Sequence, residues 1–212
     1  MCELCPRRCG VDRSSGATGF CGAGGSAVRI SRAALHAWEE PCISGTRGSG
    51  TIFFSYCTLR CVYCQNLPVS RGIAGIEVEI SRLAEIMLEL EAQGAHNINL
   101  VTPTHYAAQI LEAIEIARRR GLSLPIVYNT GGYELSSAIE RLRGAVDIFL
   151  TDYKYATNAD ALRYSGAADY IENADAALAK MVELAPLSFS SDGLLRSGVI
   201  VRHLLLPGKL TA

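Results

Sequence analysis

Strand and helix patterns alternate along the chain from about residue 51 onward. Short apolar and β-branched runs predict strands at residues 51–56, 97–102, 125–129, 147–151 and 199–205. Between them, apolar residues recur every three to four positions and predict helices at 81–93, 106–120, 135–142 and 172–184. Repeated β-α units imply right-handed crossovers and a parallel sheet. Periodicity does not decide between an open sheet and a partial barrel.

Residues 1–50 show no sustained periodicity. They are rich in Cys, Gly, Arg and Ser, so they can bury little apolar surface without help. A small segment of this kind usually needs a metal to become ordered. We therefore expect a Cys-rich metal-binding N-terminal module at 1–50 and a core domain at 51–212.

Polar residues follow each predicted strand, and parallel strands bring such residues to one edge of a sheet. They are the cysteines of 57–64, the segments 102–105 and 129–132, Asp152 to Lys154, and Arg202 with His203. The sequence therefore predicts a single site at the carboxyl ends of the strands.

Composition narrows the class of protein. The 212 residues are 49% hydrophobic, which suits one compact domain. The net charge of -1, from 20 basic and 21 acidic residues, argues against nucleic acid as a partner. No apolar run is long enough to span a bilayer, and the N-terminus lacks the pattern of a secretory signal. We expect a cytoplasmic protein, in which a reducing environment argues against disulfides between the eight cysteines.

Three cysteines follow the first predicted strand. Cys57, Cys61 and Cys64 have the spacing C-x3-C-x2-C, and Tyr63 precedes the last of them. A short loop with three thiolates can hold three corners of an iron–sulfur cubane and leave one iron open. A zinc site would usually take a fourth protein ligand or a water, and no fourth cysteine or histidine lies close in sequence.

Four further cysteines, at Cys2, Cys5, Cys9 and Cys21, could close a structural zinc site or hold another iron–sulfur cluster. Their spacing does not choose between the two. Cys42 has no partner in sequence and is predicted to be a small buried residue.

Residues 53–66 closely resemble the cluster loop of radical S-adenosylmethionine enzymes, whose defining motif is C-x3-C-x-aromatic-C. The resemblance implies a partial (β/α) barrel and a [4Fe–4S] cluster on Cys57, Cys61 and Cys64. It further implies reductive cleavage of S-adenosylmethionine to a 5′-deoxyadenosyl radical, which abstracts hydrogen from a substrate. By the same resemblance, Tyr63 lies against the adenine.

Other segments resemble the group related to pyruvate formate-lyase activating enzymes, at residues 5–7, 39–41, 48–54, 64–66, 101–105, 129–133 and 201–204. This likeness implies an activase that takes hydrogen from a glycine of a partner protein, and an electron donor such as flavodoxin or ferredoxin. Two alternatives stay open: a radical enzyme acting on a small molecule or RNA, and a cluster-binding scaffold without catalysis.

Cofactor contacts carry over by resemblance to Asn129, Thr130, Asp152, Lys154 and Arg202. The Asp-x-Lys segment resembles one that contacts the nucleoside, and Arg202 resembles an arginine that reaches the cofactor carboxylate. An Asp–Lys pair two residues apart would otherwise be a surface ion pair of little energetic value.

Two features depart from the resemblance. Residues 102–105 stand where activating enzymes carry a Gly-Gly-Glu-like segment, so His105 is either a ligand-side donor or a helix N-terminal residue. The family continues beyond the Leu-Pro-Gly segment at 206–208 with at least one more β-α unit, whereas this chain ends at Ala212. We therefore expect a C-terminally incomplete barrel.

Overall fold

Five parallel strands form the centre of the sheet in the computed structural model, which describes residues 1–207. They are β2 (Ser49–Phe54), β4 (Ile98–Val101), β5 (Ile126–Thr130), β6 (Ile148–Tyr153) and β8 (Leu195–His203). The first four are buried for most of their length, as expected for strands between two covered faces. Gly208, which the sequence placed just after the last strand, lies outside the described residues.

Antiparallel strands complete the sheet at both edges, in the order β3-β1-β2-β4-β5-β6-β8-β7. They are β1 (Val28–His36), β3 (Ile76–Val78) and β7 (Ser188–Phe189). The strand β1 belongs to the sheet although it precedes the predicted domain boundary at residue 50. A bulge between Ile30 and Arg32 interrupts the alternation of buried and exposed residues in β1, and the second half of this strand is only partly buried. The sequence therefore lacks the alternating pattern that would have predicted β1.

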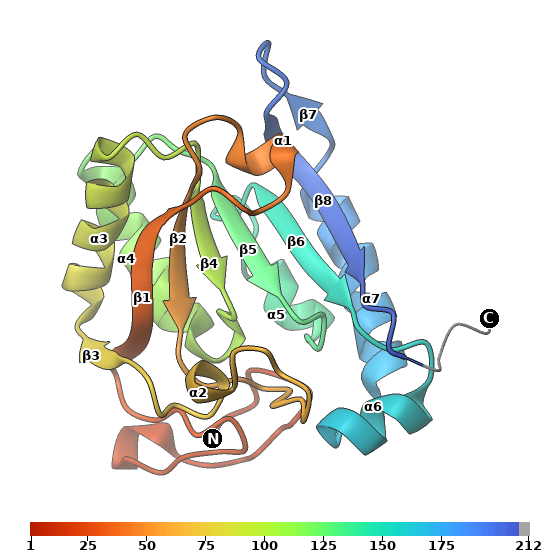
Figure 1. Ribbon diagram of the computed structural model, residues 1–212. Coiled ribbons are helices and arrows are strands. Elements are labelled where there is room, and N and C mark those ends of the chain that lie inside the picture. Colours follow the sequence, from red (N-terminus) through yellow and green to blue (C-terminus); the bar gives the residue numbers. More distant parts are fainter. Residues whose placement is uncertain (208–212) are drawn as a thin grey trace.

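Helices cover one face of the sheet, which we call the helix face (Figure 1). They are α3 (Ile80–Ala92), α4 (Ala107–Arg119), α5 (Ser136–Glu140) and α7 (Tyr170–Leu184). Leu83 and Met87 of α3 are fully buried in one cluster with Leu100 and Phe149. The shorter helices are α1 (Pro41–Ser44), α2 (Leu67–Ser70) and α6 (Asn158–Ser165), with 3-10 turns at Arg13–Ser15 and Thr104–Tyr106.

The opposite face, which we call the inner face, divides into an apolar and a polar part. Near the amino ends of the strands, Ile43 of α1 packs on Val127, Ile148 and Leu150. Toward the carboxyl ends, Asn129 and the register pair Asp152 and Arg202 occupy the same face. The inner face is thus apolar near the amino ends of the strands and charged near their carboxyl ends, which we call its outer end.

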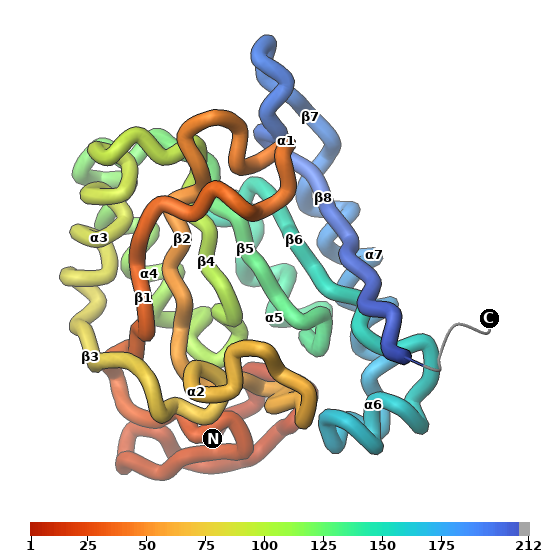
Figure 2. Tube along the Cα trace, in the orientation of Figure 1, coloured from red at the N-terminus to blue at the C-terminus, as the bar shows by residue number. Residues whose placement is uncertain are grey.

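The N-terminal segment, residues 1–27, runs past the carboxyl ends of β2, β4 and β5, beside α2 (Figure 2). It therefore lies next to the edge at which the predicted site residues gather. No helix in residues 1–207 is both long and apolar enough to cross a membrane.

The predicted α/β fold, a partial barrel with a small Cys-rich N-terminal region, is confirmed. Every predicted strand and helix exists, with ends displaced by a few residues. The helix α6 and the short elements α1, α2, β3 and β7 were not predicted, because they are too short or too exposed to show a period.

Candidate cluster and cofactor site

The cluster loop, residues 56–64, leaves the end of β2 and folds back on itself. Tyr56 and Arg60 adopt left-handed backbone conformations, with φ of 73° and 51°, which are uncommon for residues other than glycine. The Val62 amide donates to the Tyr164 carbonyl at 2.9 Å, and the Cys64 amide to the Cys61 carbonyl at 3.2 Å. Such strain persists only where surrounding contacts hold it.

The three thiols of this loop are near enough for Cys61 and Cys64 to affect the pKa of Cys57, and two of the three receive hydrogen-bond donors. The Leu59 amide donates to Cys57 Sγ at 3.4 Å, and the Ser165 hydroxyl donates to Cys61 Sγ at 3.0 Å. Burial raises the pKa of Cys57 to about 11; the neighbouring Cys61 and Cys64 raise it further, while loop amides lower it. Within residues 1–207, no three such side chains stand ready to hold a metal ion. The donor set is nevertheless that of an iron–sulfur cluster, because three thiols share one short loop and two of them accept hydrogen bonds, as thiolate ligands of a cluster do.

A charged network forms at the outer end of the inner face. Asp152 accepts from Lys154 Nζ at 2.5 Å through one oxygen and from Arg202 Nε at 2.7 Å through the other. Arg202 Nη2 also donates to Asn129 Oδ1 at 2.8 Å. The side chains of Asp152 and Lys154 are only 19% and 20% exposed, so this is not a solvated surface ion pair. The structure therefore brings together four of the six residues expected to contact the cofactor.

Two acidic residues join this network, and the sequence assigned them no role. Arg202 Nη1 lies 3.6 Å from both Glu39 Oε2 and Glu40 Oε1, in the loop before α1. Burial raises the pKa of Glu39, and the Arg202 charge opposes this rise. Arg202 thus already faces three carboxylates, and a bound carboxylate would compete with them. Its contact with a cofactor carboxylate stays a prediction.

The cluster loop and the charged network meet at Gly131. A Cβ placed there would lie 2.8 Å from Leu59 Cδ1 and 3.3 Å from Lys154 Cε, so both side chains pack over this glycine. Next to it, Gly132 has φ of +82°, and a Cβ there would lie 2.2 Å from the Asp152 carbonyl oxygen. Two successive glycines therefore allow the end of β5 to approach both neighbours.

Residues 51–194 match the family model of the radical SAM superfamily. The chain belongs to the radical SAM superfamily. It is also 28% identical, over 218 residues, to an uncharacterized protein of Methanocaldococcus jannaschii. That similarity covers 99% of this chain and 58% of the relative, so the chain spans well under two thirds of the relative's length.

Membership of the radical SAM superfamily implies a [4Fe–4S] cluster and S-adenosylmethionine. The matched segment contains the three cysteines of the cluster loop, Asn129, Asp152 and Lys154. Arg202, Glu39 and Glu40 lie outside the matched segment.

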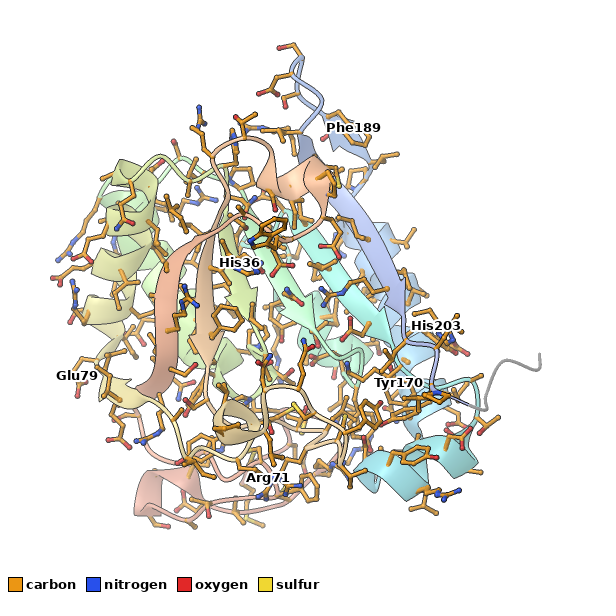
Figure 3. All side chains as sticks on the ribbon, viewed as in Figure 1. His36, Arg71, Glu79, Tyr170, Phe189 and His203 are labelled. Carbon is orange, nitrogen blue, oxygen red and sulfur yellow. The ribbon has the colours of Figure 1, made fainter. Side chains whose placement is uncertain are left out.

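Tyr170 is a residue of the site that the sequence did not indicate. Its hydroxyl accepts from the Lys154 amide at 2.8 Å, and it lies 3.0 Å and 3.1 Å from the carbonyl oxygens of Gly131 and Asp152. Its side chain is fully buried, at the carboxyl-end edge of the sheet (Figure 3). Tyr170 thus ties the ends of β5 and β6 together. No local pattern could reveal this, because the contacts join distant parts of the chain.

Two predicted cofactor contacts are placed differently from the rest. Thr130 is directed toward the helix face, where its hydroxyl donates to Glu134 at 2.5 Å. Tyr63 packs edge-on against Tyr155 and Tyr164, with ring centroids 6.3 Å and 5.9 Å apart. The structure therefore does not bring Thr130 into the charged network, and it places Tyr63 in an aromatic cluster beside the thiols.

His105 holds the backbone that leads into the cluster loop. It is fully buried, and its Nε2 donates to the Ser55 carbonyl at 2.8 Å, just before the loop begins. Burial lowers the pKa of His105 to about 4; the Ser55 bond raises it and the nearby Arg13 charge lowers it. Of the two expectations for His105, the structure favours the helix N-terminal residue, because His105 lies in the 3-10 turn directly before α4.

Glu134 is a second buried ionisable group that the sequence did not single out. Its carboxyl accepts from the hydroxyls of Thr104 and Thr130, each at 2.5 Å. Burial raises its pKa to about 7, and these two bonds lower it. Glu134 also contributes to a raised pKa, of about 12, at the Cys5 thiol, where burial is the largest cause.

The four N-terminal cysteines lie in the segment beside this edge. Phe20 N donates to Cys9 Sγ and Arg13 Nη2 to Cys21 Sγ, both at 3.2 Å. Within residues 1–207, no three His, Cys, Asp or Glu side chains are arranged to hold a metal ion. Zinc or a second cluster on Cys2, Cys5, Cys9 and Cys21 therefore remains a prediction.

Replacing Gly132 by alanine is expected to destabilise the protein strongly. The new Cβ would meet the Asp152 carbonyl, which must move, and the left-handed backbone adds a steric cost. We expect a loss of roughly 3 kcal/mol or more in urea unfolding. The matched control is Gly144→Ala, which has φ of +75° but no atom within 4 Å of the new Cβ. Its loss should be about 1–2 kcal/mol, and equal losses in the two variants would contradict the close approach at Gly132.

Acidification is expected to destabilise the native protein through His105. The folded pKa of about 4 lies below the ordinary value of 6.5, so the stability from neutral His105 is present above pH 6.5 and is lost as the pH falls through 4. His105→Gln keeps a donor for the Ser55 carbonyl but does not titrate. Between pH 7 and pH 4.5, the native protein should lose about 2 kcal/mol more than this variant in urea unfolding. Parallel pH profiles would show that His105 does not titrate with folding.

Proposed function

We propose that this chain is a radical SAM enzyme that holds its [4Fe–4S] cluster on Cys57, Cys61 and Cys64 and binds S-adenosylmethionine beside the charged network. The observation that carries the proposal is the contact at Gly131, where Leu59 of the three-thiol loop and Lys154 of the network pack on the same residue. Cluster ligands and charged cofactor-binding groups are therefore neighbours, as a reaction between cluster and cofactor requires.

The chain's own residues would hold and shield the bound groups. When bound and reduced, the cluster supplies the electron that cleaves S-adenosylmethionine to a hydrogen-abstracting 5′-deoxyadenosyl radical. Leu59 and Ser165 stabilise the sulfur ligands through their hydrogen bonds. A buried cluster that contains Tyr133, Tyr155 and Tyr170 packs around Cys61 and keeps water away from this side. The polar side chains of Asp152, Lys154 and Asn129 would orient the nucleoside.

For the substrate, we propose a protein partner, with a glycine as the site of hydrogen abstraction. The support is the likeness of segments 39–41, 101–105, 129–133 and 201–204 to activating enzymes. The M. jannaschii relative is uncharacterized and adds no information about the substrate. We propose that a flavodoxin or ferredoxin supplies the electron. We further propose that the reaction takes place in the reducing environment of the cytoplasm.

The proposal predicts that the reconstituted protein forms 5′-deoxyadenosine from S-adenosylmethionine under a strong reductant without oxygen. Cys61→Ser should reduce this rate at least about a hundredfold, because one iron loses its thiolate. The matched control is Cys42→Ser, since Cys42 packs beside Ile43 at the other end of the sheet and should leave the rate unchanged. Product would be measured by chromatography against time.

Two results would count against parts of this proposal. A cluster that forms in the native protein without any 5′-deoxyadenosine would favour the scaffold without catalysis. Product that forms at the same low rate with and without candidate glycyl-radical partner proteins would argue against a protein substrate, while leaving the radical SAM chemistry in place.

A further inference from the structure

Three arginines join the N-terminal segment to the site. Arg13 Nη1 donates to the His105 carbonyl at 2.5 Å, and Arg60 of the cluster loop donates to the Phe20 carbonyl at 2.9 Å. Arg7 makes the third connection. Each guanidinium connects the N-terminal segment with the cluster loop, the turn before α4 or the end of α6, so the segment is fastened to residues around the three thiols.

Arg7 has the most extensive of these contacts. Its Nε donates to the Thr58 carbonyl at 2.9 Å, and its Nη2 donates to the Ser165 carbonyl at 2.6 Å. Nη1 donates to the neighbouring Gly166 carbonyl. All three nitrogens of one planar group are therefore occupied by carbonyl oxygens from two different parts of the chain, a geometry that a lysine ammonium cannot reproduce.

Both targets of Arg7 lie next to cluster-ligand positions. Thr58 follows Cys57 directly in the cluster loop. Ser165 ends α6, and its hydroxyl donates to Cys61 Sγ at 3.0 Å. Arg7 therefore holds the backbone beside one sulfur and the residue that donates to a second sulfur.

Stacking fixes the direction of the guanidinium. The Arg7 Cζ atom lies 3.8 Å from the centroid of the Phe20 ring and 5.1 Å from that of Tyr133. The Arg60 Cζ atom lies 5.7 Å from the same Phe20 ring. The aromatic rings restrict the motion of Arg7, so that its three donors stay aimed at the carbonyls.

We propose that Arg7 is a positioning residue for the cluster, acting through the Thr58 and Ser165 backbone rather than by contact with iron. The inference rests on the proposed function, because it concerns the same three thiols. Arg7 has two separable effects. Its fork orders the cluster loop, and its positive charge beside the loop favours the more negative, reduced form of a cluster.

Two substitutions separate these effects. Arg7→Lys keeps the charge and loses the fork, whereas Arg7→Gln loses both. The matched control is Arg8→Gln, at the next residue, whose side chain is exposed. All three variants leave the cysteines and the charged network intact.

Hydrogen exchange of the metal-free protein tests the ordering effect. The amides of Val62 and Cys64 are bonded within and beside the loop, and they report on its opening. Both Arg7 variants should exchange at least about tenfold faster in the peptide that covers residues 57–64. In both Arg7 variants, exchange in helix α3 should stay at the native rate. In the Arg8→Gln control, exchange of the peptide that covers residues 57–64 should also stay at the native rate. Unchanged loop exchange in both Arg7 variants would overturn the proposed ordering role.

Redox titration of the reconstituted protein tests the charge effect. The midpoint potential of Arg7→Gln should be more negative than that of the native protein, whereas Arg7→Lys should stay near the native value. Equal potentials in all proteins would overturn the electrostatic part. A native protein that takes up no cluster would contradict the proposed function instead, and the hydrogen-exchange result would then decide on Arg7 alone.

Discussion

The charge of Asp152 is the constraint on which the inner face depends. A carboxylate that is mostly removed from water is unfavourable unless each oxygen has a donor, and here Lys154 and Arg202 supply one each. Lys154 lies two residues farther along the chain, just past the end of β6, and Arg202 is the register partner of Asp152 on β8. Pairing this charge therefore fixes how β6 and β8 align. A shift by one residue would turn Arg202 to the helix face and leave Asp152 with one partner.

The need to pair the Asp152 carboxylate also constrains the elements around β6 and β8. Arg202 has further N–H groups. Its Nη2 donates to Asn129 on β5, and its Nη1 forms ion pairs with the carboxylates of Glu39 and Glu40 before α1. The backbone around Asp152 must also stay in place, and Tyr170 from α7 holds it through the Lys154 amide. Strands, helix layer and the loop before α1 are thus connected through one small group of polar atoms.

The sequence predicted the parts of the site whose signal is local. Cys57, Cys61 and Cys64 share one loop, so their spacing alone indicated a cluster. Asp152 and Lys154 were found through the resemblance of their Asp-x-Lys segment to one in activating enzymes, which is also a local signal. Thr130 was assigned to the cofactor, yet it neighbours Asn129 on a strand, and adjacent side chains point to opposite faces.

Long-range contacts were beyond the reach of sequence patterns. Ser165 donates to the sulfur of Cys61 across 104 positions of the chain, and Arg7 reaches Ser165 across 158. Neither residue type has a spacing that marks such a role. The strand β1 was missed for a different reason, since its bulge cancels the alternation on which strand prediction relies. Local periodicity therefore predicted the scaffold, whereas the residues that hold the site together are identified only by the folded structure.

The charge balance of the site bears on how a cofactor would lie in it. Three carboxylates, from Glu39, Glu40 and Asp152, surround the two cations Lys154 and Arg202. A positively charged ligand group is therefore favoured near the acidic side chains, and S-adenosylmethionine carries both a sulfonium and an ammonium group. The carboxylate of S-adenosylmethionine would find fewer free donors, because Nε and Nη2 of Arg202 already donate to Asp152 and Asn129. Attraction for the cationic groups, rather than capture of the carboxylate by Arg202, is thus the electrostatic contribution that this arrangement supports best.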